Sequence, residues 1–388
     1  NPTNPTNPRD QPKKQCTDCK ESSAASPVLY RIEEQSLGKG SSGRVRLATD
    51  LETGRPAACK IISKRGRTER ALIRLRREAE LLSHLRHDNI LQLQATAEDD
   101  RFIFLFTEYV CGGDLASYLS EHGPLSEQRA RYLFQQVLDA VQYAHHCGIV
   151  HRDIKLENIL YDPHTDRIKL ADFGLGDWMT SRREPPSSSS SSSSAVSLSL
   201  SQADLAASRE SSRNDRRLTR HCGSPSYAPP ELVARIPYRG EPVDVWSMGV
   251  LLYVMLLGRF PFGCDQDHHA VLRRVANDPL RFPADISLSP SLVLLLTQML
   301  NKNPDARLTL AQVRFSAWMR AVSRTACKCT VDEGVQPLSN DTQFPSSTAT
   351  TSCASSASSI RRGRRARLWE KIMQLRERIA PASIAASV

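Results

Sequence analysis

A short run near the middle of the chain constrains its fold most. His151-Arg152-Asp153-Ile154-Lys155-Leu156-Glu157-Asn158 places a carboxylate, an ammonium and an amide in one loop, and Ala171-Asp172-Phe173-Gly174 follows shortly after. Such side chains can accept a proton, hold an anion and ligate a hard cation. Three matching residues recur by chance, but two such motifs at this separation do not. The sequence therefore predicts one polar site that contains Asp153, Lys155, Asn158 and Asp172.

The two motifs resemble the catalytic loop and the metal-binding triplet of the eukaryotic protein kinases. The resemblance implies that Asp153 accepts the proton of the substrate hydroxyl and that Lys155 contacts the migrating phosphoryl group. It assigns Asn158 and Asp172 to Mg²⁺, and it implies ATP as the phosphate donor. It covers about residues 30 to 320. The implied fold is α+β and bilobal, with a small antiparallel β-rich lobe that carries one main helix and a larger helical lobe.

An upstream glycine pattern predicts a nucleotide-binding turn. It matches GxGxxGxV, whose glycines let the backbone approach a triphosphate while the valine covers the adenine. The same spacing occurs in dinucleotide-binding folds, where the glycines lie between a strand and a helix. Here the next expected element is another strand, as in the kinase hairpin. The nucleotide-binding residues implied are Leu37, Gly38, Lys39, Gly40, Ser41, Ser42, Gly43, Arg44 and Val45.

A lysine and a glutamate are expected to form an ion pair behind this turn. Lys60 ends Ala57-Ala58-Cys59-Lys60, where the kinase pattern has the lysine that holds the α- and β-phosphates. Its partner should be a carboxylate on the following helix, and Glu78 fits best. Glu80 is the nearby competitor, but it lies about 200° around the helix from Glu78. A solvated helix face is the alternative for both acids.

The link between the two lobes is expected at Thr107-Glu108-Tyr109-Val110, which resembles the kinase hinge. The resemblance implies that the Glu108 carbonyl and the Val110 backbone face the adenine. Asp114 would meet the ribose or a basic residue of the substrate, and Leu160 completes the implied nucleotide contacts. An ordinary buried strand end is the alternative for this segment.

Two features, Lys155 and a segment after the metal-binding triplet, predict the class of acceptor residue. Lys155, two residues after Asp153, distinguishes serine/threonine kinases from tyrosine kinases, and Cys222-Gly223-Ser224-Pro225 resembles the segment that receives the substrate, with Ser224 bonding Asp153 and Lys155. The resemblance also implies a buried ion pair between Glu231 and Arg307, and an Asp244 carboxylate that orients the catalytic loop.

A regulatory phosphorylation is expected at Thr219, because Arg152 is the kind of residue that pairs with a phosphate in this segment. The related kinases have their threonine two residues before the cysteine, where this chain has Arg220. Two explanations are open: the loop is shifted, or Arg220 removes the need for a phosphate.

Within the kinases, Lys155-Leu156-Glu157-Asn158 and Tyr253-Val254-Met255-Leu256 resemble the calcium/calmodulin-dependent and AMP-activated group. This implies protein substrates with serine or threonine acceptors. Asp114 and Glu157 can attract basic residues upstream of the acceptor.

The pattern of apolar residues predicts strands first and helices afterwards. Strands are expected at 30–37, 44–50, 55–62, 90–94 and 102–109, with a helix at 70–85. Helices are then expected at 115–121, 126–146, 244–257, 268–277, 291–300 and 310–317. The domain is predicted to span residues 28–320.

Three segments lie outside this plan. Residues 1–27 are rich in Pro, Asn and Thr and are expected to be disordered, and so is an insert at 179–218 with eight consecutive serines. A Ser/Thr-rich linker is expected at 321–360. Residues 361–388 begin with an arginine cluster and continue with apolar residues at helical spacing. Such a tail can bind calmodulin, an anionic membrane or the catalytic cleft itself, or serve as a solvated basic segment or a nuclear-import patch.

Composition excludes some classes of function. The net charge is +10, and nine of these charges come from residues 181–220 and 361–388, so the catalytic body does not suggest a nucleic-acid binder. No run approaches the roughly 20 apolar residues of a membrane span. Isolated cysteines suggest a reducing compartment, so a cytoplasmic location is expected, with the nucleus as the alternative.

The sequence therefore predicts a Mg-ATP-dependent serine/threonine protein kinase. The alternative is a pseudokinase or scaffold that acts through its serine-rich insert and basic tail. A small-molecule kinase is a third hypothesis, which the segment through Glu231 disfavours because that segment serves a docked peptide.

Overall fold

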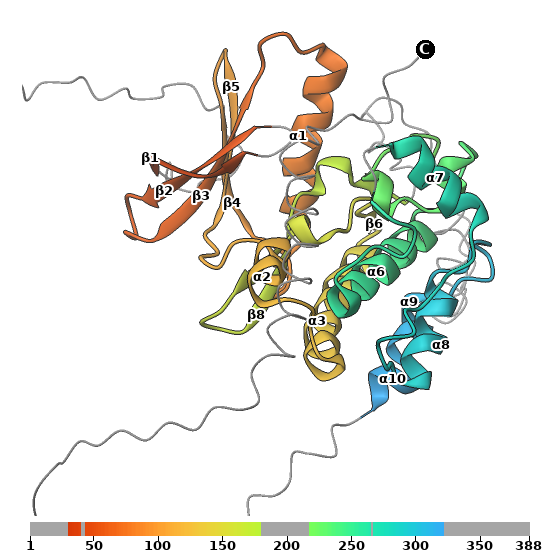
Figure 1. The fold of residues 1–388 in the computed structure, drawn as a ribbon. Helices are drawn as coiled ribbons and strands as arrows, with labels where there is room; N and C mark the ends of the chain where they lie inside the picture. The colour runs from red at the N-terminus through yellow and green to blue at the C-terminus, as the bar shows by residue number, and fades with distance from the viewer. Residues whose placement is uncertain (1–29, 40–42, 180–216, 265–266, 322–388) are drawn as a thin grey trace, which may run out of the picture.

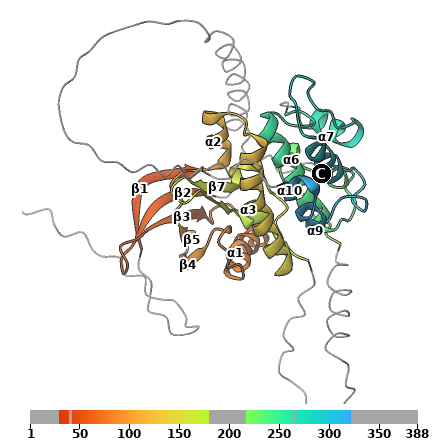
Figure 2. The ribbon, with the colours of Figure 1, turned by 90° about the horizontal axis from the view of Figure 1, so that it is seen from below.

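The computed structural model describes residues 30–39, 43–179, 217–264 and 267–321. The chain folds into a small lobe, formed by a sheet with one helix, and a larger lobe formed mainly of helices. Figure 1 shows the sheet and α1 on one side and helices α6 to α10 on the other, and Figure 2 shows the same separation from below. The predicted α+β bilobal fold is confirmed.

The small lobe is a five-stranded antiparallel sheet in the order β1-β2-β3-β5-β4. Its strands are β1 (Tyr30–Lys39), β2 (Arg44–Asp50), β3 (Pro56–Ser63), β4 (Leu93–Glu98) and β5 (Phe102–Glu108). Helix α1 (Glu69–Ser83) begins where the Thr68 side chain accepts the Ala71 N–H. It buries Leu75, Leu81 and Leu82, which recur at helical spacing. The same face buries Glu78, so packing of α1 fixes the direction of that carboxylate.

The large lobe is built around α6 (Gly240–Leu257), whose residues are almost all buried. This helix is long and apolar enough to cross a membrane, but 89% of the apolar stretch is buried inside the protein, so it is a core helix. Around it lie α2 (Leu115–His122), α3 (Glu127–His146), α5 (Pro230–Val233), α7 (His268–Asn277), α8 (Pro290–Met299), α9 (Leu310–Arg314) and α10 (Ala317–Arg320).

Two small two-stranded sheets frame the predicted site residues. Strand β6 (Ile149–Val150) pairs with β9 (Asp177–Trp178), and β7 (Ile159–Asp162) pairs with β8 (Arg167–Leu170). The segment between β6 and β7 is the loop that carries Asp153, and the segment between β8 and β9 carries Asp172. Pairing within these two small sheets therefore brings the loop of Asp153 and the segment of Asp172 together.

Two of the sequence predictions of elements are wrong in detail. The fourth strand is Leu93–Glu98 rather than 90–94, and Ile90 forms only an isolated bridge to Leu170. The Gln-Ala-Thr-Ala-Glu sequence of β4 has weak strand propensity, and pairing with β5 overrides this weak propensity. The helix expected at 310–317 is two helices, because the Ser316 hydroxyl accepts the Met319 N–H and starts α10. The expected segments at 1–27, 321–360 (beyond residue 321) and 361–388, and the insert between 180 and 216, lie outside the described residues.

Candidate active site

The catalytic loop, defined here as residues 151–158, is held from below by a buried carboxylate of α6. Asp244 is fully buried, and its oxygens accept the N–H groups of His151 (2.9 Å) and Arg152 (2.7 Å) and the ring Nε2 of His145 (2.7 Å). Burial favours the neutral acid, but these donors and the nearby histidines outweigh it and lower the pKa of Asp244. The predicted role of Asp244 in orienting this loop is confirmed by these contacts.

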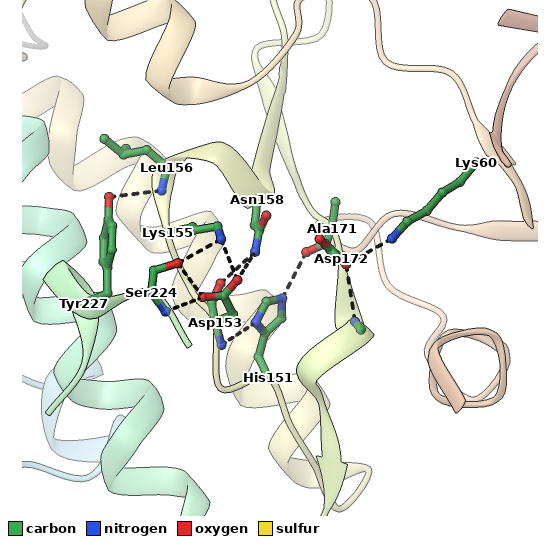
Figure 3. Close-up of polar contacts among 11 residues, drawn as sticks. Lys60, His151, Asp153, Lys155, Leu156, Asn158, Ala171, Asp172, Ser224 and Tyr227 are labelled. Atoms are coloured by element: carbon green, nitrogen blue, oxygen red, sulfur yellow. Dashed lines mark hydrogen bonds and ion pairs between the residues drawn. The ribbon is translucent and has the colours of Figure 1, made fainter. Parts of the chain in front are cut away.

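Asp153 lies at the centre of a hydrogen-bonded cluster (Figure 3). Its Oδ2 lies 2.6 Å from the Lys155 ammonium, and its Oδ1 accepts both the N–H and the hydroxyl of Ser224, at 3.0 and 2.9 Å. Lys155 also donates to the Ser224 hydroxyl at 2.9 Å. The predicted contacts of Ser224 with Asp153 and Lys155 are therefore present. They join the catalytic loop to the segment that was expected to receive the substrate.

Asn158 completes this cluster on the other side of Asp153. Its amide nitrogen donates to the Asp153 carbonyl at 2.8 Å and to Oδ2 at 3.2 Å. These bonds fix the orientation of the amide, and its oxygen faces away from Asp153 (Figure 3). The loop residue His151 packs edge-on against Phe173, with ring centroids 4.6 Å apart, and so ties the loop to the metal-binding triplet.

The lysine of β3 joins the two lobes. Lys60 Nζ lies 2.6 Å from Glu78 Oε1 and 3.1 Å from Asp172 Oδ1. Burial opposes the charged ammonium, but Asp172 and Glu78 outweigh burial and raise the pKa of Lys60. Burial likewise opposes the Asp172 carboxylate, but Lys60 lowers the pKa of Asp172 to about 2. The pair predicted between Lys60 and Glu78 is present, and Glu80 is exposed, as expected for the competitor.

The donor set at this position suits Mg²⁺. The carboxylate of Asp172 and the amide oxygen of Asn158 are hard oxygen ligands, and Mg²⁺ is commonly bound by one or two protein oxygens together with phosphates and waters. Asp172 adopts a left-handed backbone conformation, with φ 60°, which few non-glycine residues adopt. Strain of this kind is typical of functional sites.

The predicted nucleotide-binding residues lie on the hairpin of β1 and β2. Gly38 pairs with Val45, and Lys39 pairs with Arg44. A side chain at Gly43 would place its Cβ 2.3 Å from the Ile61 carbonyl, so this close approach to β3 requires glycine. Leu37 is also on β1, whereas Gly40, Ser41 and Ser42 lie outside the described residues.

The predicted hinge residues lie at the junction of the lobes. The Glu108 side chain is directed into the structure, because it accepts the Gln92 N–H at 2.9 Å and pairs with Lys169 at 2.9 Å. Asp114 caps α2 through the Ser117 N–H at 2.8 Å and forms an isolated bridge with Leu160. Asp114 and Leu160 thus come together although they are far apart in the sequence.

Other predicted contacts belong to the segment that follows the metal-binding triplet, here called the activation segment (residues 172–231). Its far end is fixed by the predicted ion pair between Glu231 and Arg307, with N–O distances of 2.8 and 3.1 Å. Both side chains are buried. Thr219 is exposed, and its neighbour Arg220 is exposed as well.

One charged residue in this region was missed by sequence reasoning. Asp177 in β9 is buried and contacts two arginines, Arg77 of α1 and Arg152 of the catalytic loop. Nothing in the periodicity around Asp177 predicts this. The only signal was its position five residues after Asp172, close to the catalytic residues.

Comparisons with known proteins agree with this geometry. The model of the protein kinase domain matches residues 31–319. NUAK family SNF1-like kinase 1 of Homo sapiens is 35% identical over 302 residues, which cover 77% of this chain and 40% of the relative. Serine/threonine-protein kinase SIK1 of Mus musculus is 37% identical over 289 residues, or 74% of this chain and 32% of the relative.

A third related kinase comes from Schizosaccharomyces pombe. Mitosis inducer protein kinase cdr1 of Schizosaccharomyces pombe is 37% identical over 279 residues, which cover 72% of this chain and 40% of the relative. The chain thus spans less than half the length of these curated relatives. The expected resemblance to the group that includes the AMP-activated kinases is confirmed. With the domain model matching most of the chain, and with the site residues assembled as described, the chain belongs to the protein kinase domain family.

Proposed function

We propose that the chain is a Mg-ATP-dependent serine/threonine protein kinase that transfers the γ-phosphoryl group of ATP to protein hydroxyls. The observation that carries this proposal is the assembled pair of clusters, Asp153 with Lys155 and Lys60 with Glu78 and Asp172. The names of the related kinases also support it.

The mechanism follows from the positions of the charges. Asp153 accepts the proton of the serine or threonine hydroxyl as the hydroxyl oxygen bonds to the γ-phosphorus and the bond from phosphorus to the β–γ bridging oxygen breaks. Lys155 stabilises the negative charge on the migrating group from the same side, and Lys60 holds the phosphates that remain on ADP. Asn158 and Asp172 would hold Mg²⁺, which would supply neutralisation of the phosphate charge.

Contacts of the Lys155 ammonium favour serine and threonine as acceptors. Lys155 bridges Asp153 and Ser224, so it fills the space beside the catalytic carboxylate. A lysine at this position, two residues after the proposed catalytic aspartate, is typical of serine/threonine kinases and not of tyrosine kinases. The activation segment therefore supports a serine/threonine kinase acting on docked protein chains.

Two acids support a preference for basic residues upstream of the acceptor. Burial raises the pKa of Glu157, while the neighbouring Lys155 lowers it. The Oε2 atom of Glu157 is buried and has no hydrogen-bond partner among the described residues. A guanidinium from a bound peptide would provide that partner. Asp114 adds a second carboxylate next to the cleft, since its negative charge acts on Glu157.

The proposal is tested by ATP-dependent labelling of a serine peptide with upstream arginines. Wild-type protein should label the peptide in the presence of Mg²⁺, and Asp153→Ala should lose on the order of 10³-fold in kcat while it keeps its fold. Asp88→Asn is the matched control, because it removes an exposed acid, paired with Arg167, far from the site. A pseudokinase or scaffold would show no labelling that depends on Asp153, and this outcome would refute the proposal.

The flanking segments support further proposals that rest on sequence alone. The arginine cluster and apolar stripe of residues 361–388 favour regulation through calmodulin or through an autoinhibitory contact in cis. Truncation at Val331 should then raise basal activity. Unchanged activity and an unchanged response to calcium–calmodulin would leave the tail a localisation role. We further propose a cytoplasmic location, with nuclear import through the arginine cluster as the alternative.

A further inference from the structure

A buried carboxylate lies between the small lobe and the catalytic loop. Asp177 Oδ1 lies 2.5 Å from Nη2 of Arg77, and Oδ2 lies 3.3 Å from Nη2 of Arg152. The Trp178 N–H also donates to Oδ1 at 2.9 Å. Asp177 and Arg152 are buried, and the Arg77 side chain is about one-third exposed. A carboxylate shielded in this way interacts with its cations far more strongly than an exposed one.

The two arginines occupy positions that matter for the chemistry. Arg77 directly precedes Glu78, which pairs with Lys60, and Arg152 directly precedes Asp153. The Asp177 carboxylate thus connects the neighbour of Glu78 in α1 with the neighbour of Asp153 in the catalytic loop. Any change in the distance between α1 and the catalytic loop must stretch this bridge.

The backbone of Arg152 shows why the loop needs such a partner. Its φ of 65° lies in the left-handed region, which costs free energy for a residue with a side chain. Its guanidinium donates to the carbonyls of Leu175 (2.8 Å) and Gly176 (3.4 Å) and to the hydroxyl of Tyr238 (3.3 Å). These acceptors are neutral. Among the described residues, Asp177 is the acid that forms an ion pair with this guanidinium.

The alternatives for regulation can now be distinguished by the sign of the charge. Thr219 was expected to carry a phosphate for Arg152, and Arg220 stands where related kinases have a threonine. Arg220 cannot replace a phosphate, because it carries the same charge as Arg152. The negative charge that Arg152 needs is already supplied by Asp177.

We propose that Asp177 is a positioning residue whose carboxylate joins α1 to the catalytic loop in place of an activation-segment phosphate. Phosphoryl transfer by this chain then does not require phosphorylation of Thr219. The inference rests on the proposed kinase function. It identifies the residue that sets the active arrangement and assigns Thr219 no role in switching it.

The test uses full-length protein treated with phosphatase, with the absence of phosphate checked by mass spectrometry. Wild type and Thr219→Ala should label the arginine-containing serine peptide with kcat values that agree within about twofold. Asp177→Asn should lower kcat/KM about tenfold, because loss of its ion pairs with Arg77 and Arg152 uncouples α1 from the loop. The loss should include a higher KM for ATP, since the Lys60–Glu78 pair is displaced. Asp177→Glu should recover part of the activity.

A double-mutant cycle separates this role from a general loss of stability. Arg77→Gln breaks one of the two ion pairs of Asp177 and should lower kcat/KM by no more than Asp177→Asn does, and the double variant should cost no more than Asp177→Asn alone. Asp88→Asn removes the acid of an exposed ion pair and should leave both the rate and the KM for ATP unchanged. If Asp177→Asn does not fold, Arg77→Gln carries the same prediction, because Arg77 is only partly buried.

Each outcome bears on one claim. Full activity of folded Asp177→Asn would overturn the inference, and so would additive losses in the cycle. Unphosphorylated wild type that becomes at least about tenfold more active after phosphorylation of Thr219 would also overturn it, while leaving the kinase function standing. Wild type that labels nothing in either state would instead refute the proposed function.

Discussion

The catalytic loop and the activation segment are adjacent but are held in different ways. The loop is fixed by the almost entirely buried helix α6, because Asp244 of this helix accepts two of the loop's backbone N–H groups. The two sides of the insert in the activation segment are anchored mainly by a small cluster, formed by Val150, Met179, Leu218, Leu232, Tyr238 and Val243. Leu218 also forms a two-hydrogen-bond bridge with Tyr238.

This difference separates chemistry from control. Groups that must keep a fixed geometry are tied to the large core, whose packing allows little movement. A segment held by a few contacts can move at a small cost in free energy, as regulatory elements must. The Asp177 bridge lies at the boundary, since it connects the start of the activation segment to the loop and to α1.

The largest effect is expected at Asp172, where the activation segment begins. Asp172 opens the activation segment, yet it contacts Lys60 and belongs to the chemistry. Asp172→Ala should abolish phosphoryl transfer, a loss on the order of 10³-fold or more, because it removes a metal ligand and a partner of Lys60. The fold should persist, because the Asp172 side chain is about one-third exposed and is not part of the apolar core. Rates from ATP-dependent labelling and a thermal melt check both statements, and normal activity of a folded variant would contradict the mechanism.

The next effect tests the attachment of the loop to the core. Asp244→Asn replaces one accepting oxygen by a donor that faces a backbone N–H, so one buried N–H of the loop loses its partner. The free energy of unfolding should fall by about 2 kcal/mol, and activity should fall with it. Urea denaturation measures the first change. Asp88→Asn, which breaks the exposed pair with Arg167, should cost less than about 1 kcal/mol. Equal costs for the two variants would show that the loop does not depend on α6.

The two regions also differ in how well the sequence predicted them. The positions of Lys60, Glu78, Asp153, Asn158 and Asp172 were predictable, because each lies in a motif whose spacing is set by the chemistry. The Glu231–Arg307 pair followed from the same resemblance. Expected helices such as His268–Asn277 agree with the structure because the apolar periodicity and the polar residues at the ends indicate the same helix.

What could not be predicted depends on contacts between distant segments. Arg77 and Asp177 are 100 residues apart in the chain, and neither is in a motif. The shift of β4 to Leu93–Glu98 is set by its partner strand and not by its own residues. Local sequence carries no signal for contacts of either kind.

A smaller effect should appear when the anchor of the activation segment is weakened. Leu218 is 3% exposed, and Leu218→Ala leaves a cavity while the backbone bridge to Tyr238 can persist. We expect a loss of activity of a few-fold and faster amide exchange at residues 217–222, because local opening costs less than global unfolding. The midpoint of thermal unfolding should change little. Leu51→Ala, at a side chain that is about half exposed, is the control. A large drop in the midpoint would place Leu218 in the main core.

The smallest expected effect comes from the serine-rich insert itself. Met179 and Leu218, on the two sides of the insert, lie in the same small cluster, so the protein holds both ends of the connection whatever its length. Deleting Ser187–Ser201 shortens this connection by 15 residues, which changes its closure free energy by less than about 1 kcal/mol. The value of kcat/KM for the peptide should therefore stay within about twofold of wild type. If activity were lost, the insert would contribute structure to the substrate cleft, and the cluster of Met179 and Leu218 would not be sufficient to hold the activation segment.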